Sequence, residues 1–111
     1  MEEIYGIVPP MVTPFTADEK VDETALQTDV NYLIETAGIH GLAVCGSTGE
    51  GHTLTTDETR QITAVAIDAT DGRVPVITGI ITDSTKLAIE RGKAVADLGV
   101  TALQVTPVHY L

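Results

Sequence analysis

Residues 41–58 read GLAVCGSTGEGHTLTTDE and carry three structural signals in succession. The run at 41–45 is short and apolar, which is typical of a buried strand. The glycine-rich stretch GSTGEG at 46–51 follows it directly. Thr55 and Glu58 then form a capping box, which marks the start of a helix. The segment therefore predicts a strand, a loop at the carboxyl end of that strand, and a helix.

The same alternation of apolar strand and periodic helix runs along the whole chain, with strand starts roughly 30 residues apart. The expected strands lie within 5–13, 41–45, 74–78 and 102–106. The three expected helices run from Asp22 to near Gly38, from Thr55 to near Gly72, and from Asp83 or Ser84 to near Gly99. Apolar strands joined by helices predict a parallel α/β sheet, either doubly wound or part of a (β/α)8 barrel. Arg91 falls among the apolar positions of the third helix.

Length narrows the choice between these architectures. The 111 residues suffice for one small domain, whereas a (β/α)8 barrel needs ~250 residues. The sequence also stops shortly after its fourth expected strand, which is unusual for a complete doubly wound domain. We therefore interpret 1–111 as a single partial domain, either the N-terminal part of a larger fold or a half-barrel that pairs with a second copy.

Composition excludes several kinds of partner. The net charge of -10 argues against nucleic-acid backbones and anionic membranes as partners. Cys45 is the single cysteine, so an intrachain disulfide or a thiolate zinc cluster is excluded, and a reducing cytoplasm fits. MEEIYGIVPP lacks the basic start of a secretory signal, and no run approaches the ~18 apolar residues of a membrane span. We expect a cytoplasmic protein that binds neither nucleic acid nor membrane.

The loop at 46–51 resembles a phosphate-binding P-loop in part. Gly46, Gly51 and Thr53 have the spacing of G-x-x-x-x-G-K-[ST], but His52 replaces the lysine that neutralises phosphate charge. No Asp or Glu ends a neighbouring expected strand to hold Mg²⁺. A carboxylate site fits better, because Ser47 and Thr48 offer hydroxyl and backbone N–H groups at the end of a strand, where α/β folds bind ligands.

An ordered set of motifs makes the chain similar to the dihydrodipicolinate synthase / N-acetylneuraminate lyase family of class I, Schiff-base, pyruvate-dependent aldolases. The matching residues are GIV at 6–8, VTPF at 12–15, GL at 41–42, GSTGE at 46–50, LT at 54–55, Glu58 and Arg60, GRVPVI at 72–77, Gly79, and VTP at 105–107. The resemblance implies a (β/α)8 TIM barrel, of which this chain would supply the N-terminal half, strands one to four.

The resemblance also implies roles for individual residues. Ser47 and Thr48 are expected to bind the carboxylate of pyruvate or another 2-oxo acid, and Ser47 to join a proton relay. Dihydrodipicolinate synthases usually carry two tyrosines after Thr-Pro, but Val108 and His109 stand there and Tyr110 follows, which favours another aldolase, lyase or hydratase of the family. His109 and Tyr110 are therefore both candidates for acid–base catalysis. Cys45 is expected to be a core residue and His52 to pack in the loop.

The nucleophile expected from the family is missing from the sequence. The family's imine-forming lysine lies on a later strand, and Lys20, Lys86 and Lys93 fall in a turn and on a helix instead. The resemblance implies a lyase that joins or cleaves a 2-oxo acid and an aldehyde, without a metal or organic cofactor, as a homotetramer built from dimers. Two alternatives remain: a non-catalytic half-barrel that binds a carboxylate, and a P-loop-like phosphate binder.

Overall fold

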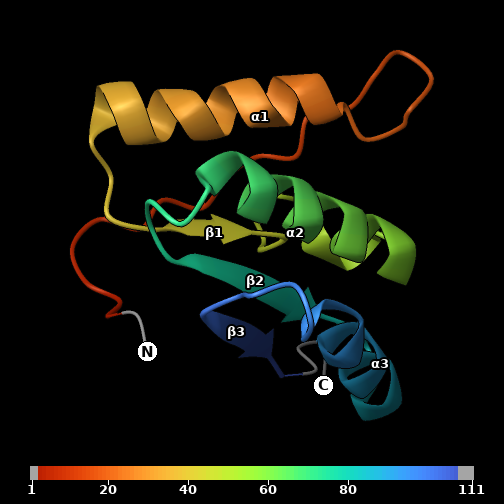
Figure 1. The fold of residues 1–111 in the computed structure, drawn as a ribbon. Coiled ribbons are helices and arrows are strands. Elements are labelled where there is room, and N and C mark those ends of the chain that lie inside the picture. Colours follow the sequence, from red (N-terminus) through yellow and green to blue (C-terminus); the bar gives the residue numbers. More distant parts are fainter. Residues whose placement is uncertain (1–2, 108–111) are drawn as a thin grey trace.

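The computed structural model describes residues 3–107, and its helices and strands alternate along the chain (Figure 1). The helices are α1 (Glu23–Tyr32), α2 (Thr56–Thr70) and α3 (Thr85–Val95), and the strands are β1 (Leu42–Val44), β2 (Val76–Ile81) and β3 (Ala102–Thr106). A π-helical turn, Leu33–Ala37, extends α1, and a 3₁₀ turn, Gly51–Thr53, precedes α2. No helix among the described residues is long and apolar enough to cross a bilayer.

The three strands form one parallel sheet in the order β1-β2-β3. Val44 pairs with Thr78, and Ile81 at the end of β2 pairs with Thr106 at the end of β3. The carboxyl ends of the strands therefore lie along the same edge of the sheet. The predicted parallel α/β sheet is confirmed.

The expected first strand is not a regular strand. Within 5–13, a single parallel bridge joins Pro10 to Ala43, supported by bonds from Met11 N to Ala43 O (2.8 Å) and from Ala43 N to Pro9 O (3.1 Å). Pro9 and Pro10 have no N–H group, so the ladder to β1 cannot be completed. The segment nevertheless runs alongside β1, where a first strand would lie.

The position of β2 also differs from the prediction, which ended the strand at Thr78 with Gly79 beyond it. β2 begins at Val76 because Pro75 cannot donate to the ladder, and it continues through Gly79 to Ile81. A Cβ atom at Gly79 would lie 2.5 Å from the carbonyl oxygen of Cys45. Glycine is therefore required inside the strand, where the loop after β1 approaches the backbone of β2.

The helix caps largely follow the prediction. Asp22 accepts a bond from Ala25 N (3.0 Å), and both bonds of the Thr55–Glu58 capping box form. Ser84, rather than Asp83, caps α3 by accepting from Leu87 N at 3.1 Å. α3 ends at Val95 instead of continuing to Gly99, and residues 96–99 form turns.

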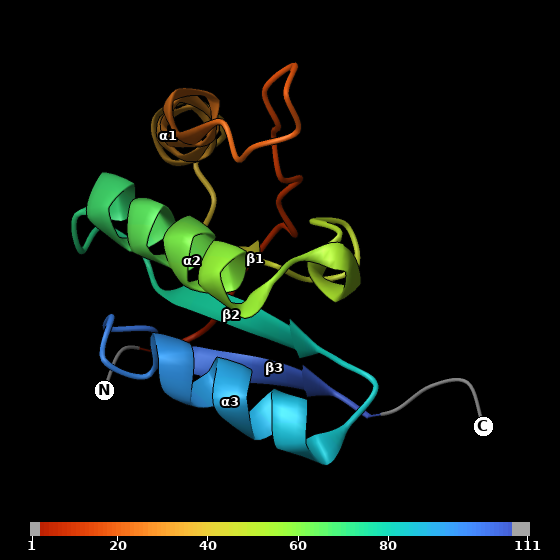
Figure 2. The same cartoon turned by 90° about the vertical axis from the view of Figure 1, so that its right-hand side faces the viewer.

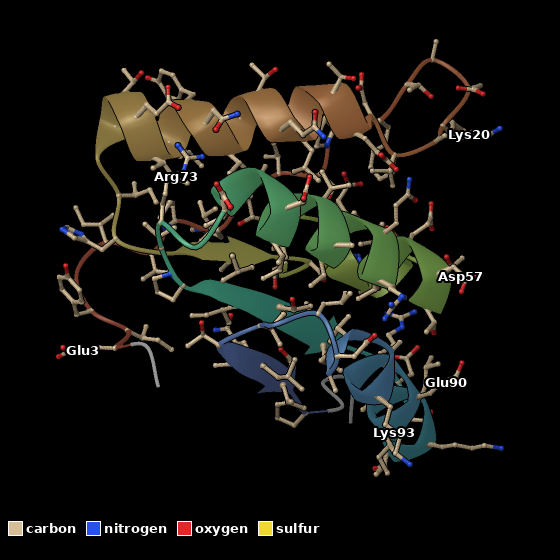
Figure 3. All side chains as sticks on the ribbon, in the orientation of Figure 1. Glu3, Lys20, Asp57, Arg73, Glu90 and Lys93 are labelled. Atoms are coloured by element: carbon tan, nitrogen blue, oxygen red, sulfur yellow. The ribbon has the colours of Figure 1, made fainter. Side chains whose placement is uncertain are left out.

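The core lies between the sheet and the helices. α2 lies across β1 and β2, α3 lies beside β3, and α1 packs against α2 (Figure 2). The largest fully buried apolar side chains come from all three helices and from every strand but β3: Leu26, Val30, Leu42, Val44, Ile62, Val76, Ile80 and Val95. Arg73 joins the end of α2 to α1 and its π-helical turn by bonding Asn31 Oδ1 (2.6 Å) and Glu35 Oε1 (3.1 Å) (Figure 3).

β3 lies at the edge of the sheet and remains exposed. Leu103 is 40% exposed and Val105 is 59% exposed. Such an apolar edge is a site of assembly or aggregation when nothing covers it.

Two glycines should respond to alanine in opposite directions. Gly79→Ala should lower the free energy of unfolding by ~1–3 kcal/mol, because the new methyl group collides with the Cys45 carbonyl. A Cβ atom at Gly92, inside α3, would make only an ordinary 3.5 Å contact with Leu103 Cδ1, so Gly92→Ala should raise the free energy of unfolding by ~0.5–1 kcal/mol. Urea denaturation of both variants checks this. If both variants changed the free energy of unfolding by the same amount in the same direction, the close packing inferred at Gly79 would be contradicted.

Candidate active site at the carboxyl ends of the strands

An open hollow of about 340 Å³ lies at the carboxyl ends of the strands. It is lined by Ser47 from the loop after β1, His52 from the 3₁₀ turn, Ile81 at the end of β2 and Thr106 at the end of β3. In barrels and open α/β sheets this end of the sheet binds the ligand. Another hollow, of about 300 Å³, lies between residues 9–12 and α1, but it is mostly apolar and contains no predicted site residue.

Ser47 and Thr48 stand exposed on this loop with unused hydrogen-bonding groups. The turn is closed around them by bonds from Gly51 N to Gly46 O (2.9 Å) and from Glu50 N to Ser47 O (3.1 Å). Within residues 3–107, the N–H and hydroxyl groups of Ser47 and Thr48 donate to no protein acceptor. Two N–H groups and two hydroxyls are thus available to a two-oxygen anion. Ser47 lines the hollow, and Thr48 is its exposed neighbour.

Close backbone contacts determine the shape of the loop. The buried Thr13 hydroxyl donates to Gly49 O at 2.7 Å, which ties the loop to the segment that precedes α1. A Cβ atom at Gly49 would lie 2.8 Å from Met11 O, and one at Gly51 would overlap Cys45 O. Both positions therefore require glycine for a packing reason, in addition to any functional one.

Cys45 is a buried residue with an inert thiol. It is 1% exposed, and burial raises the pKa of its thiol to about 12, although the Thr63 hydrogen bond and the positive charge of Arg91 act in the opposite direction. A thiol with so high a pKa is not ionised near neutral pH and cannot serve as a nucleophile. The structure agrees with the expected core role.

The local geometry does not favour a P-loop. In a P-loop the helix starts at the lysine, so that its first N–H groups face the phosphates. Here His52 lies exposed in a 3₁₀ turn, and α2 begins only at Thr56. His52 instead lines the hollow from one side.

The remaining sequence-predicted groups lie away from the hollow or outside the described residues. Lys20 lies on the loop before α1, and Lys93, like Lys86, lies exposed on α3 (Figure 3). None of these lysines is at the end of a strand. His109 and Tyr110 fall outside residues 3–107. Within that range, no group of three His, Cys, Asp or Glu side chains comes together as metal ligands would.

Sequence reasoning assigned no role to three residues that the structure brings to the site. Ile81 lay beyond the expected end of its strand, and Thr106 was recognised only as part of a motif. Arg91 is 7% exposed, and its guanidinium bonds the backbone of Gly51, Leu54 and Ile81. A charged residue at an inward position of an amphipathic helix was the available signal for Arg91.

Comparison with known proteins identifies the family. The model of the dihydrodipicolinate synthetase family matches residues 3–111. The chain belongs to this family. It is 44% identical to the 4-hydroxy-tetrahydrodipicolinate synthase of Salinibacter ruber over 105 residues, which are 95% of this chain and 34% of that protein. The chain thus spans about a third of the length of the curated relatives it matches.

Solved structures of family members share the fold. CdNal from Clostridium difficile in complex with mannosamine matches 99% of this chain and 38% of its own, with a TM-score of 0.91 and 30% identity. YagE from E. coli K12 in complex with pyruvate matches 90% of this chain and 33% of its own, with a TM-score of 0.85 and 36% identity. The predicted fold class is confirmed: the chain forms part of a (β/α)8 barrel.

Burial of the Cys45 thiol should make stability depend on alkaline pH. The folded state holds the thiol proton up to about 12, whereas the ordinary pKa is 9.0, so the unfolded chain loses it first. The free energy of unfolding should therefore fall by ~1.4 kcal/mol per pH unit above about pH 9 from this group. Urea titrations of wild type and Cys45→Ala from pH ~7 to ~10.5 isolate the effect. The difference in the free energy of unfolding between wild type and Cys45→Ala should be constant below about pH 8 and shrink above about pH 9. A constant difference throughout would show that the thiol is not protected.

Proposed function

We propose that the protein containing this chain is a pyruvate-dependent class I aldolase or lyase. The observation that supports this most directly is that the two N–H and two hydroxyl groups of Ser47 and Thr48 have no acceptor within residues 3–107 and stand at the ligand-binding end of a family barrel. A 2-oxo acid carries a flat carboxylate, and its two oxygens match donors arranged on one short turn.

Ser47 and Thr48 would bind the carboxylate and so orient the 2-oxo group for attack by a lysine amine. Imine formation joins the amine nitrogen to the carbonyl carbon and releases the carbonyl oxygen as water. The imine then accepts the electron pair when a carbon–carbon bond to an aldehyde forms or breaks. The lysine is none of Lys20, Lys86 or Lys93, because these are exposed away from the hollow. It would come from polypeptide outside these 111 residues.

Proton transfer is the second proposed task of the site. The Ser47 hydroxyl, which lines the hollow and has no protein acceptor within residues 3–107, would relay a proton to or from the aldehyde oxygen. His109 or Tyr110 would be the relay partner, since both follow the end of β3 closely in sequence. The proposed reaction would need no metal or organic cofactor, because the imine provides the electron sink.

The names of the relatives suggest the substrate classes. One relative is a 4-hydroxy-tetrahydrodipicolinate synthase, and one solved structure similar to this chain is a complex with pyruvate. We propose pyruvate or a related 2-oxo acid as one substrate and an aldehyde as the other. We further propose a cytoplasmic homotetramer built as a dimer of dimers, and assembly of this kind would also cover apolar surface such as the β3 edge.

Trapping of the imine tests the proposed reaction. The native gene product is incubated with pyruvate and borohydride, and its intact mass and tryptic peptides are measured. One reduced pyruvate should be attached to a single lysine outside residues 1–111, and omission of pyruvate should abolish the adduct. Unchanged mass, with pyruvate binding retained, would favour a non-catalytic carboxylate-binding protein.

Removal of the two hydroxyls should weaken pyruvate binding. Ser47→Ala and Thr48→Val each remove one donor to a charged carboxylate, so each should raise the pyruvate Kd by ~10-fold or more. Thr28→Val is the matched control, because Thr28 is an exposed threonine of α1 whose hydroxyl donates to Thr24 O (3.0 Å) within its own helix. Isothermal titration calorimetry measures the Kd. Equal affinity in all variants would mean that the carboxylate binds elsewhere.

A further inference from the structure

We propose that Arg91 is a positioning residue that holds the carboxylate-binding loop against the end of β2 and supplies an unneutralised positive charge behind it. The structural half of this inference stands on contacts within the chain. The half that concerns the ligand rests on the proposed function.

Arg91 joins two walls of the hollow through one side chain. It projects from α3 and is buried, with 7% exposure. Its Nη1 donates to Gly51 O (3.2 Å) and to Ile81 O (3.3 Å), and its Nη2 donates to Leu54 O. Gly51 precedes the lining residue His52, and Ile81 is itself a lining residue. Arg91 therefore sets the distance between the 3₁₀ turn and the end of β2.

Among residues 3–107, no carboxylate forms an ion pair with Arg91. Its three acceptors are neutral carbonyl groups, and its Nε is buried without an acceptor. The ion pairs found within residues 3–107 join other residues: Lys20–Asp18, Arg60–Asp97 and Arg73–Glu35. Burial of an unpaired cation is costly, and an apolar side chain would pack at lower cost if packing alone were needed. An anion bound at the nearby loop would recover part of this cost.

The field of Arg91 reaches the start of the loop. Its positive charge lowers the pKa of the Cys45 thiol, against the larger opposing effect of burial. Cys45 directly precedes the loop that carries Ser47. In a chain of net charge -10, a local buried cation gives this one edge of the sheet a potential that favours a carboxylate.

Arg73 provides a matched comparison inside the same chain. It also bonds backbone carbonyls, Thr70 O at 2.9 Å and Ala69 O at 2.7 Å. However, it pairs with the Glu35 carboxylate and lies before β2, at the opposite end of the sheet from the hollow. Arg73 thus has the structural role without the unpaired charge.

The test compares Arg91→Met, Arg91→Lys and Arg73→Met in the native gene product. Amide hydrogen exchange is followed at residues 51–54 and, as an internal reference, in α1, while calorimetry gives the pyruvate Kd. Arg91→Met should speed exchange at 51–54 by ~10-fold or more relative to α1. It should also raise the pyruvate Kd by ~10-fold or more. Arg91→Lys, which keeps the charge, should bring the Kd back to within a few-fold of wild type. Arg73→Met removes bonds to α1 and its π-helical turn, so it is judged on exchange at 51–54 itself; that rate and the pyruvate Kd should both stay at their wild-type values.

Each half of the inference has its own contradicting result. The positioning role is wrong if Arg91→Met leaves the exchange rate at 51–54 unchanged relative to that of α1. If Arg91→Met does not fold, the same comparison is made with Arg91→Lys. If Arg91→Met binds pyruvate as wild type does, or Arg91→Lys binds no better than Arg91→Met, the role of the charge is wrong. A wild type that binds no pyruvate overturns the proposed function and the ligand half together, whereas loop exchange still decides the positioning half.

Discussion

The carbonyl oxygen of Cys45 occupies space that a side chain on either of two other residues would need. Cβ atoms built at Gly79 and Gly51 both collide with it, and only glycine at these positions lets the three backbone segments meet. Because of this contact, the chain can leave β1, turn back over the end of β2 and still continue into α2. Ser47 lines the hollow, and Thr48 stands exposed beside it, on a turn whose glycines are packed this tightly.

Side chains from distant parts of the sequence then hold the turn in place. The Thr13 hydroxyl bonds Gly49 O, Arg91 bonds Gly51 O and Leu54 O, and the Thr55–Glu58 capping box begins α2 directly afterwards. A loop restrained on several sides would present the N–H groups of Ser47 and Thr48 with little reorganisation if a ligand binds there. Such pre-organisation is the main way in which protein dipoles stabilise bound or developing negative charge.

The overall acidity of the chain does not conflict with an anion site. The net charge of -10 belongs to the whole chain, whereas no Asp or Glu lines the hollow, and the buried Arg91 lies next to two of its walls. At short range, and away from bulk water, a few oriented donors outweigh charges that solvent and salt screen.

The sequence by itself determined the order of elements, the helix caps, the family and the loop that carries Ser47 and Thr48. These follow from local rules: apolar periodicity, capping residues and a motif confined to a few consecutive positions. The tertiary structure decided what depends on contacts between distant residues. The strand boundaries differ from the prediction at Pro9, Pro10 and Pro75, because proline has no N–H group to donate to a carbonyl of the neighbouring strand. Ile81 and Thr106 line the same hollow as Ser47, because parallel strands end at one edge of the sheet. The partners of Arg91 lie 10 to 40 positions away in sequence, so only folding could bring its guanidinium to the carbonyl groups that it bonds.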